Sequence, residues 1–102
     1  MLTDTALAGF RSFIRRSIYR ARYRVGSTWR EAAINQVEIQ PGGTVRAWLA
    51  IHPGGAATVN RVELIDSNGA TWAYQDVSIS ITDKQSGILY WFDFTIREEA
   101  IS

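Results

Sequence analysis

Hydrophobic and polar residues alternate along most of this chain, which is the pattern of β-strands with one buried face. The clearest case is residues 88–96, where five bulky apolar residues share one face of a single strand. The same period of two predicts five more strands, over residues 17–25, 28–40, 45–51, 59–66 and 70–81. The chain is therefore expected to be built mainly from strands.

Two of the expected strands change the parity of their apolar positions partway along. In the second strand the apolar residues move from even to odd numbers near Asn35-Gln36, and in the fifth they do so near Gln75-Asp76. A shift of one residue turns every following side chain to the opposite face of a sheet. We therefore predict a β-bulge at each of these two places.

The first residues follow a helical period instead. Apolar residues recur there at three- and four-residue spacing, Thr3 or Thr5 can cap the start, and Asp4 suits the first turn. This pattern predicts a short helix over about residues 4–16. Its apolar stripe consists of Leu7, Phe10, Phe13 and Ile14.

Together these elements predict a mainly β fold, with one short N-terminal helix followed by about six antiparallel strands joined by Gly-containing turns. Such a set of strands forms an antiparallel β-sandwich or a partly open barrel. Residues 1–102 are expected to be one domain, with a short C-terminal tail at residues 97–102. No linker or repeat divides the sequence.

Composition narrows the class of protein. The chain has no cysteine, so neither a disulfide framework nor a thiolate metal site is expected. No apolar stretch reaches the roughly 18 residues of a membrane span, and the N-terminus lacks the order of a signal peptide. These features favour a bacterial or phage cytoplasmic origin.

Charge is divided unevenly between the two parts of the chain. Residues 1–30 hold seven arginines against one acid, a balance of +6, while residues 31–102 hold four basic residues against nine acids, a balance of −5. A basic head and an acidic body favour binding to polyanions or head-to-tail binding to further copies of the chain.

Few residues are candidates for catalysis or metal binding. His52 is the only histidine, and it lies beside Pro53 at the end of a strand, as a solvated loop residue would. Asp76 and Asp83 fall in an expected bulge and turn, and Asp93 falls on the outward face of its strand. We predict no enzyme activity, no catalytic residue, no metal site and no cofactor.

Two sets of residues suggest a contact surface. Arg20, Arg22 and Arg24 form a row, with Trp29 and Arg30 beyond the next turn, and such mixing of cations and aromatics is typical of single-strand binders. Alternation places Tyr19 and Tyr23 on the face opposite the row, which disfavours nucleic acid as a partner. The row then forms a solvated face or pairs with acids, of which Glu63, Asp66, Glu98 and Glu99 are candidates.

The tryptophans are a second set. Trp48 and Trp91 fall opposite the cleanest apolar faces, as either contact residues or parts of a sheet buried on both sides. The predicted interface residues are Leu7, Phe10, Phe13, Ile14, Arg20, Arg22, Arg24, Trp48 and Trp91.

The C-terminal half contains an arrangement of strands and turns that is similar to one in a known protein family. It has a strand with a Glu63-Leu64 pair, a turn at Asp66-Ser67-Asn68-Gly69, and a closing strand of alternating aromatics at residues 88–96. This arrangement resembles the β domain near the start of phage tail-collar and tail-fibre proteins. The resemblance covers about 40 residues, and the basic N-terminal segment does not match it. It implies a virion structural component that assembles as a ring or trimer and has no active site.

The leading hypothesis from the sequence is therefore a non-enzymatic phage or prophage structural protein, associated with a tail, baseplate or fibre. Its partners would be itself and other phage tail proteins, and its location would be the virion, or the bacterial cytoplasm during assembly. The alternatives are an Arg-rich nucleic-acid-binding β domain and a carbohydrate-binding β-sandwich that stacks sugars on Trp48 or Trp91.

Overall fold

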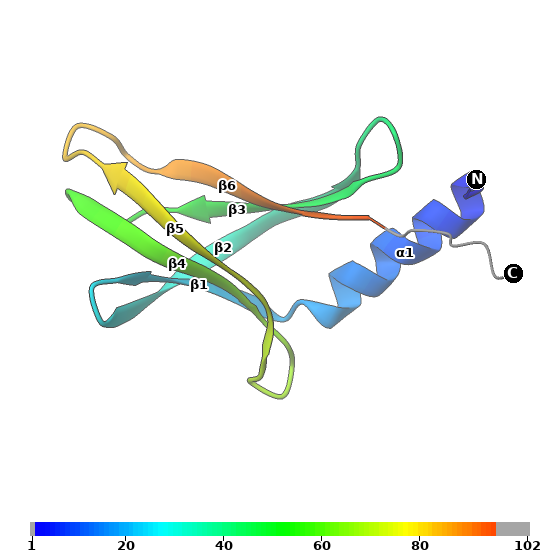
Figure 1. Ribbon diagram of the computed structural model, residues 1–102, viewed down its shortest axis with the longest axis horizontal. Helices are drawn as coiled ribbons and strands as arrows, with labels where there is room; N and C mark the ends of the chain where they lie inside the picture. The colour runs from blue at the N-terminus through cyan, green and yellow to red at the C-terminus, as the bar shows by residue number, and fades with distance from the viewer. Residues whose placement is uncertain (1, 96–102) are drawn as a thin grey trace, which may run out of the picture.

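The computed structural model describes residues 2–95, and the expected tail at 97–102, with Glu98 and Glu99, lies outside them. One helix is followed by six strands (Figure 1). They are α1 (Asp4–Ser17), β1 (Arg20–Val25), β2 (Thr28–Ile39), β3 (Val45–Ile51), β4 (Ala57–Ile65), β5 (Thr71–Ile81) and β6 (Ile88–Phe94).

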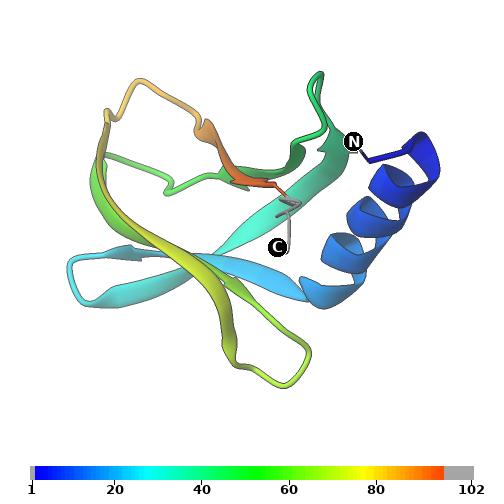
Figure 2. The same ribbon diagram turned by 45° about the vertical axis from the view of Figure 1, so that its right-hand side comes forward.

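The six strands form a single antiparallel sheet in the order β5-β4-β1-β2-β3-β6. The sheet curls round until its two end strands, β5 and β6, approach the same side of the molecule (Figures 1 and 2). The predicted mainly β fold with one short N-terminal helix is confirmed. Of the two expected architectures, the chain adopts the partly open barrel.

The barrel is left open along the seam between β5 and β6. Among residues 2–95 no backbone ladder joins these strands, and their Cα atoms stay almost everywhere more than 8 Å apart. Side chains bridge the seam instead. The rings of Trp72 and Phe94 have centroids 5.3 Å apart, and the Tyr90 hydroxyl donates a hydrogen bond to Gln75. Between β5 and β6 the barrel is therefore held together by side-chain contacts, without the backbone hydrogen bonds that join its other neighbouring strands.

Tyr90 makes this seam sensitive to high pH. Burial raises the pKa of the Tyr90 phenol above its ordinary value. Because the pKa of the phenol is higher in the folded than in the unfolded chain, protonated Tyr90 contributes to the free energy of unfolding. This contribution is fully present below the unfolded pKa of about 10, and it is lost as the pH rises through the folded pKa. We expect urea denaturation between about pH 9 and pH 11 to show a smaller stability loss for Tyr90→Phe than for the wild type. Parallel losses in the two proteins would contradict this expectation.

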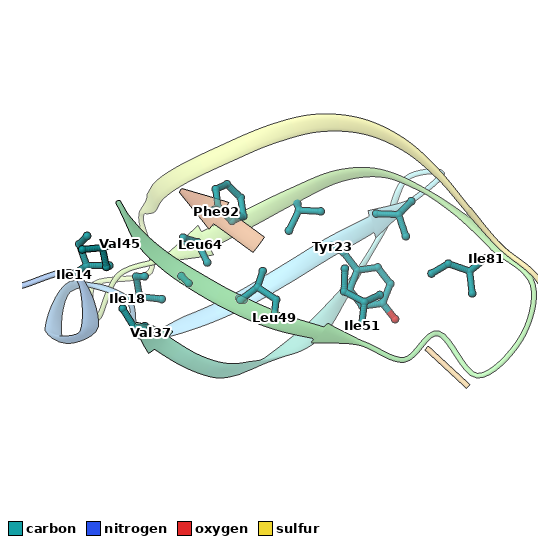
Figure 3. Close-up of a cluster of buried hydrophobic side chains, with 14 residues drawn as sticks. Ile14, Ile18, Tyr23, Val37, Val45, Leu49, Ile51, Leu64, Ile81 and Phe92 are labelled. Carbon is teal, nitrogen blue, oxygen red and sulfur yellow. The ribbon is translucent and has the colours of Figure 1, made fainter. Parts of the chain in front are cut away.

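The interior of the barrel holds the hydrophobic core. Four alternate residues of β3 are fully buried, from Val45 to Ile51, because this strand presents one whole face to the barrel interior. Tyr23, Leu49 and Ile51 belong to the same buried cluster, and Ile14 and Ile18 lie at its end nearest the helix (Figure 3).

The predicted bulge in the second strand is confirmed, since the β2–β3 register shifts between Ile34 and Gln36. The second shift lies slightly beyond its predicted place, because β5 carries its extra residue between Asp76 and Ile79. A further shift beside Trp72 was not predicted from the sequence. It lets Trp72 pack against the core while Tyr74 remains 57% exposed.

Helix α1 covers one end of the barrel, where it packs on β2 and β3. Its predicted bounds are confirmed to within one residue, and the Thr3 hydroxyl caps it by accepting a hydrogen bond from the backbone N–H of Ala6. Leu7 lies against the β2–β3 turn, where a Cβ on Gly43 would come 3.5 Å from the leucine side chain. The helix is thus fastened to the barrel through its apolar stripe.

Candidate functional site

The outer surface of the barrel carries two groups of arginine and tryptophan. The first, here the Trp29 cluster, lies on β1 and β2, and the second, the Trp48–Trp91 cluster, lies on β3 and β6. Residues of the first are Arg20, Arg22, Arg24, Trp29 and Glu31. Residues of the second are Glu38, Arg46, Trp48, Trp91 and Asp93.

The β1–β2 hairpin assembles the Trp29 cluster. Its two-residue turn begins at Gly26, with φ 63°, and pairs Arg24 with Trp29 across the strands. Cross-strand partners lie on the same face of a sheet, so Trp29 stands among the outward arginines. The guanidinium carbons of Arg22 and Arg24 lie 4.1 Å and 5.4 Å from the centroid of the Trp29 ring. These are cation–π distances.

Glu63 anchors this face from β4. It is 5% exposed, and its Oε1 accepts hydrogen bonds from Nε and Nη2 of Arg22 at 2.9 Å and 2.7 Å and from the Thr71 hydroxyl at 3.2 Å. Its Oε2 lies 3.4 Å from Nε of Arg61, whose guanidinium covers the Tyr74 ring at 3.9 Å. The prediction that the arginine row pairs with acids is confirmed for Arg22 and Glu63.

The other arginines of the Trp29 cluster are not neutralised in this way. Arg24 donates to the neutral side chain of Asn60 at 2.7 Å. The Arg30 side chain takes the other face of the hairpin, because Arg30 pairs with the buried Tyr23, and it donates to the carbonyl of Pro53 at 3.1 Å. Arg20 lies 3.7 Å from Glu31, and both of their side chains are more than half exposed. An exposed pair at that distance contributes little to stability. Positive charge therefore remains available on this face.

The Trp48–Trp91 cluster has the same residue types with a different charge balance. The Arg46 guanidinium donates to both carboxylate oxygens of Asp93, at 2.8 Å and 3.0 Å, and lies 4.7 Å from the centroid of the Trp91 ring. The rings of Trp48 and Trp91 are 5.0 Å apart, and Trp48 donates to Glu38. The hydrogen bonds to Asp93 raise the pKa of Arg46 above its ordinary value. Arg46 is thus held as a neutralised pair with Asp93.

The nine predicted interface residues take different positions. Phe13, Arg20 and Trp91 are exposed, and Ile14 is fully buried within its own domain. The other five are partly buried: Leu7 and Phe10 on the helix, Arg22 and Arg24 in the Trp29 cluster, and Trp48 beside Glu38.

Candidate catalytic residues do not gather at one place. His52 is exposed in its loop with Nδ1 3.0 Å from the carbonyl oxygen of Ser86, Asp76 lies 3.4 Å from Arg61, and Asp93 binds Arg46. Within residues 2–95 no group of three His, Cys, Asp or Glu residues could hold a metal ion. No helix in the same part of the chain is long and apolar enough to cross a membrane.

Two features of this surface escaped the sequence reasoning. Trp29 was noted beyond the turn that follows the arginine row, but it was not placed on the arginine face, although the two-residue turn at Gly26-Ser27 fixes that register. The burial of Glu63 had no local signal, because it depends on Arg22 and Thr71 from other strands.

Comparison of the chain with protein-family models, with curated proteins and with solved structures finds no match.

Proposed function

We propose that this protein is a non-enzymatic structural protein of the phage or prophage tail type, which self-associates through its β domain. The observation that carries the proposal is the outer face of β6. Leu89 and Trp91 are 56% and 45% exposed there, on a strand whose second edge pairs with no other strand in residues 2–95. Large apolar side chains on an open edge favour docking of another chain.

The two open edges of the sheet differ in how well they resist such docking. On β5 the outward positions include Asp76, Ser78 and Ser80, and register shifts distort the strand. Charges and bulges of this kind hinder edge-to-edge pairing. On β6 the only charge is Asp93, which Arg46 neutralises. We therefore assign the self-association edge to β6, with a second copy of the chain as its partner.

The proposal predicts an oligomer that one surface substitution disrupts. The wild type should elute above monomer mass in size-exclusion chromatography with light scattering at tens of micromolar. Leu89→Lys should shift it towards the monomer, because formation of the contact would strip water from the lysine charge without providing a partner for it. Tyr19→Lys is the matched control, since Tyr19 is 70% exposed and lies outside β6. A strictly monomeric wild type, or equal effects of both substitutions, would reject the proposed edge.

As a tail-type component, the protein would bind itself in a ring or trimer and contact other tail proteins. It would be present in the virion and, during assembly, in the bacterial cytoplasm. The resemblance of the β4–β6 region to tail-collar and tail-fibre domains supports this location. Mass spectrometry of purified tailed particles tests it, and particles that lack the protein would contradict it.

A further inference from the structure

The Trp29 cluster carries an excess of positive charge that the rest of the domain does not balance. Its three arginines face two carboxylates, Glu31 within the cluster and Glu63 beneath it, which leaves a formal +1. Only Arg22 is tightly bound to an acid; Arg24 donates to a neutral oxygen, and the Arg20–Glu31 pair is long and exposed. A ligand for this face should therefore be anionic.

A hollow of about 170 Å³ lies over the same face. It is lined by Arg20, Ala21, Arg22, Trp29, Arg30 and Glu31. The ring of Trp29 remains 36% exposed at this hollow, although Arg22 and Arg24 approach it. An aromatic ring and several guanidinium groups thus border one open space.

We propose that the Trp29 cluster is a binding site for single-stranded nucleic acid. Guanidinium groups bind phosphate oxygens through paired N–H donors, and the proposal assigns this role to Arg20 and Arg24. Unpaired bases stack on aromatic rings and on guanidinium planes, and the Trp29–Arg22 pair offers such a platform. The sequence disfavoured nucleic acid because Tyr19 and Tyr23 were placed opposite the arginines. Trp29 removes that objection, since it lies on the arginine face.

The Trp48–Trp91 cluster is a natural comparison within the same barrel. Its single arginine, Arg46, is bound by Asp93 and lies near Glu38, so its formal balance is −1. It has aromatic rings but no spare positive charge. If aromatic stacking alone were sufficient, both clusters would bind a strand; the charge balance assigns binding to the Trp29 cluster.

The test uses the full chain and a fluorescein-labelled oligothymidine of about 15 nucleotides in an anisotropy titration at low salt. Contacts to about two phosphates predict a slope near −1.4 in log K against log salt, or roughly a 7-fold weakening from 50 to 200 mM. Arg24→Gln should weaken binding by about 3- to 10-fold and reduce the slope. Trp29→Ala should weaken it roughly 5- to 150-fold through lost stacking.

Arg16→Gln is the charge-matched control. Arg16 is exposed on α1, at the end of the barrel away from the β1–β2 turn (Figure 1). It should bind the oligonucleotide as the wild type does, and circular dichroism should show that every variant is folded. No binding by the wild type at low salt, or equal losses in Arg16→Gln and Arg24→Gln, would overturn the site. Equal affinity for a duplex or for polyglutamate would overturn the assignment to single strands. The wild-type titration is independent of the β6 edge, so Leu89→Lys should leave it unchanged.

Discussion

Tyr23→Ala should lower the free energy of unfolding by about 3–5 kcal/mol, because it removes the largest fully buried side chain of the described core. Tyr23 is 1% exposed and belongs to the buried cluster in the barrel interior (Figure 3). The strands around it belong to one hydrogen-bonded sheet and cannot collapse readily into the cavity. Since domains of this size are stable by about 5–15 kcal/mol, the loss is a large share of the total.

Tyr19→Ala provides a matched control for this core substitution. Tyr19 is the same residue type four positions earlier, yet it is 70% exposed, so its truncation should cost less than about 0.5 kcal/mol. Urea denaturation followed by tryptophan fluorescence measures both. Equal losses for Tyr19→Ala and Tyr23→Ala would contradict the inward placement of Tyr23.

Glu63→Gln should lower the free energy of unfolding by about 2–3 kcal/mol. The substitution preserves the shape of the side chain but removes the negative charge that faces Arg22 and Arg61. Nε of Arg61 is buried without a hydrogen bond and depends on the nearby carboxylate for compensation. Removing one member of a buried charged pair is costly because the other charges remain in place.

The control for Glu63 is Glu31→Gln. The Glu31 side chain is 77% exposed and lies 3.7 Å from Arg20, so water screens the pair and the expected loss is close to zero. A double-mutant cycle of Glu63→Gln with Arg22→Gln should give a coupling of about 1–2 kcal/mol. A coupling near zero, or equal effects of Glu31→Gln and Glu63→Gln, would contradict the role of Glu63 as an anchor.

The two outer faces of the barrel divide the proposed roles between them. The β6 face presents Leu89 and Trp91 with its one arginine, Arg46, neutralised, which suits contact with a second copy. The β1–β2 face presents a stacked Trp29 with spare cations, which suits an anionic strand. The same pair of residue types therefore supports different ligands, and the position of the acids decides between them.

Much of the local structure followed from periodicity. The helix at the N-terminus, the six strands and the bulge near Gln36 depend on residues within one segment, and the structure confirms them. The outward direction of Asp93 followed in the same way, because alternation along one strand fixes which face each side chain takes. Its partner Arg46 did not follow, since strand pairing joins residues far apart in the sequence.

Residue patterns within single segments were enough to predict a mainly β chain with a helical start, an uneven division of charge and the inward or outward direction of most side chains. Three features came from the three-dimensional fold: the curl of the sheet into a barrel with an open β5–β6 seam, the burial of Glu63 beneath Arg22, and the position of Trp29 among arginines. The reason is physical. Periodicity records which face of a strand is apolar. The curl of a sheet and the residues that surround each side chain depend instead on which strands become neighbours.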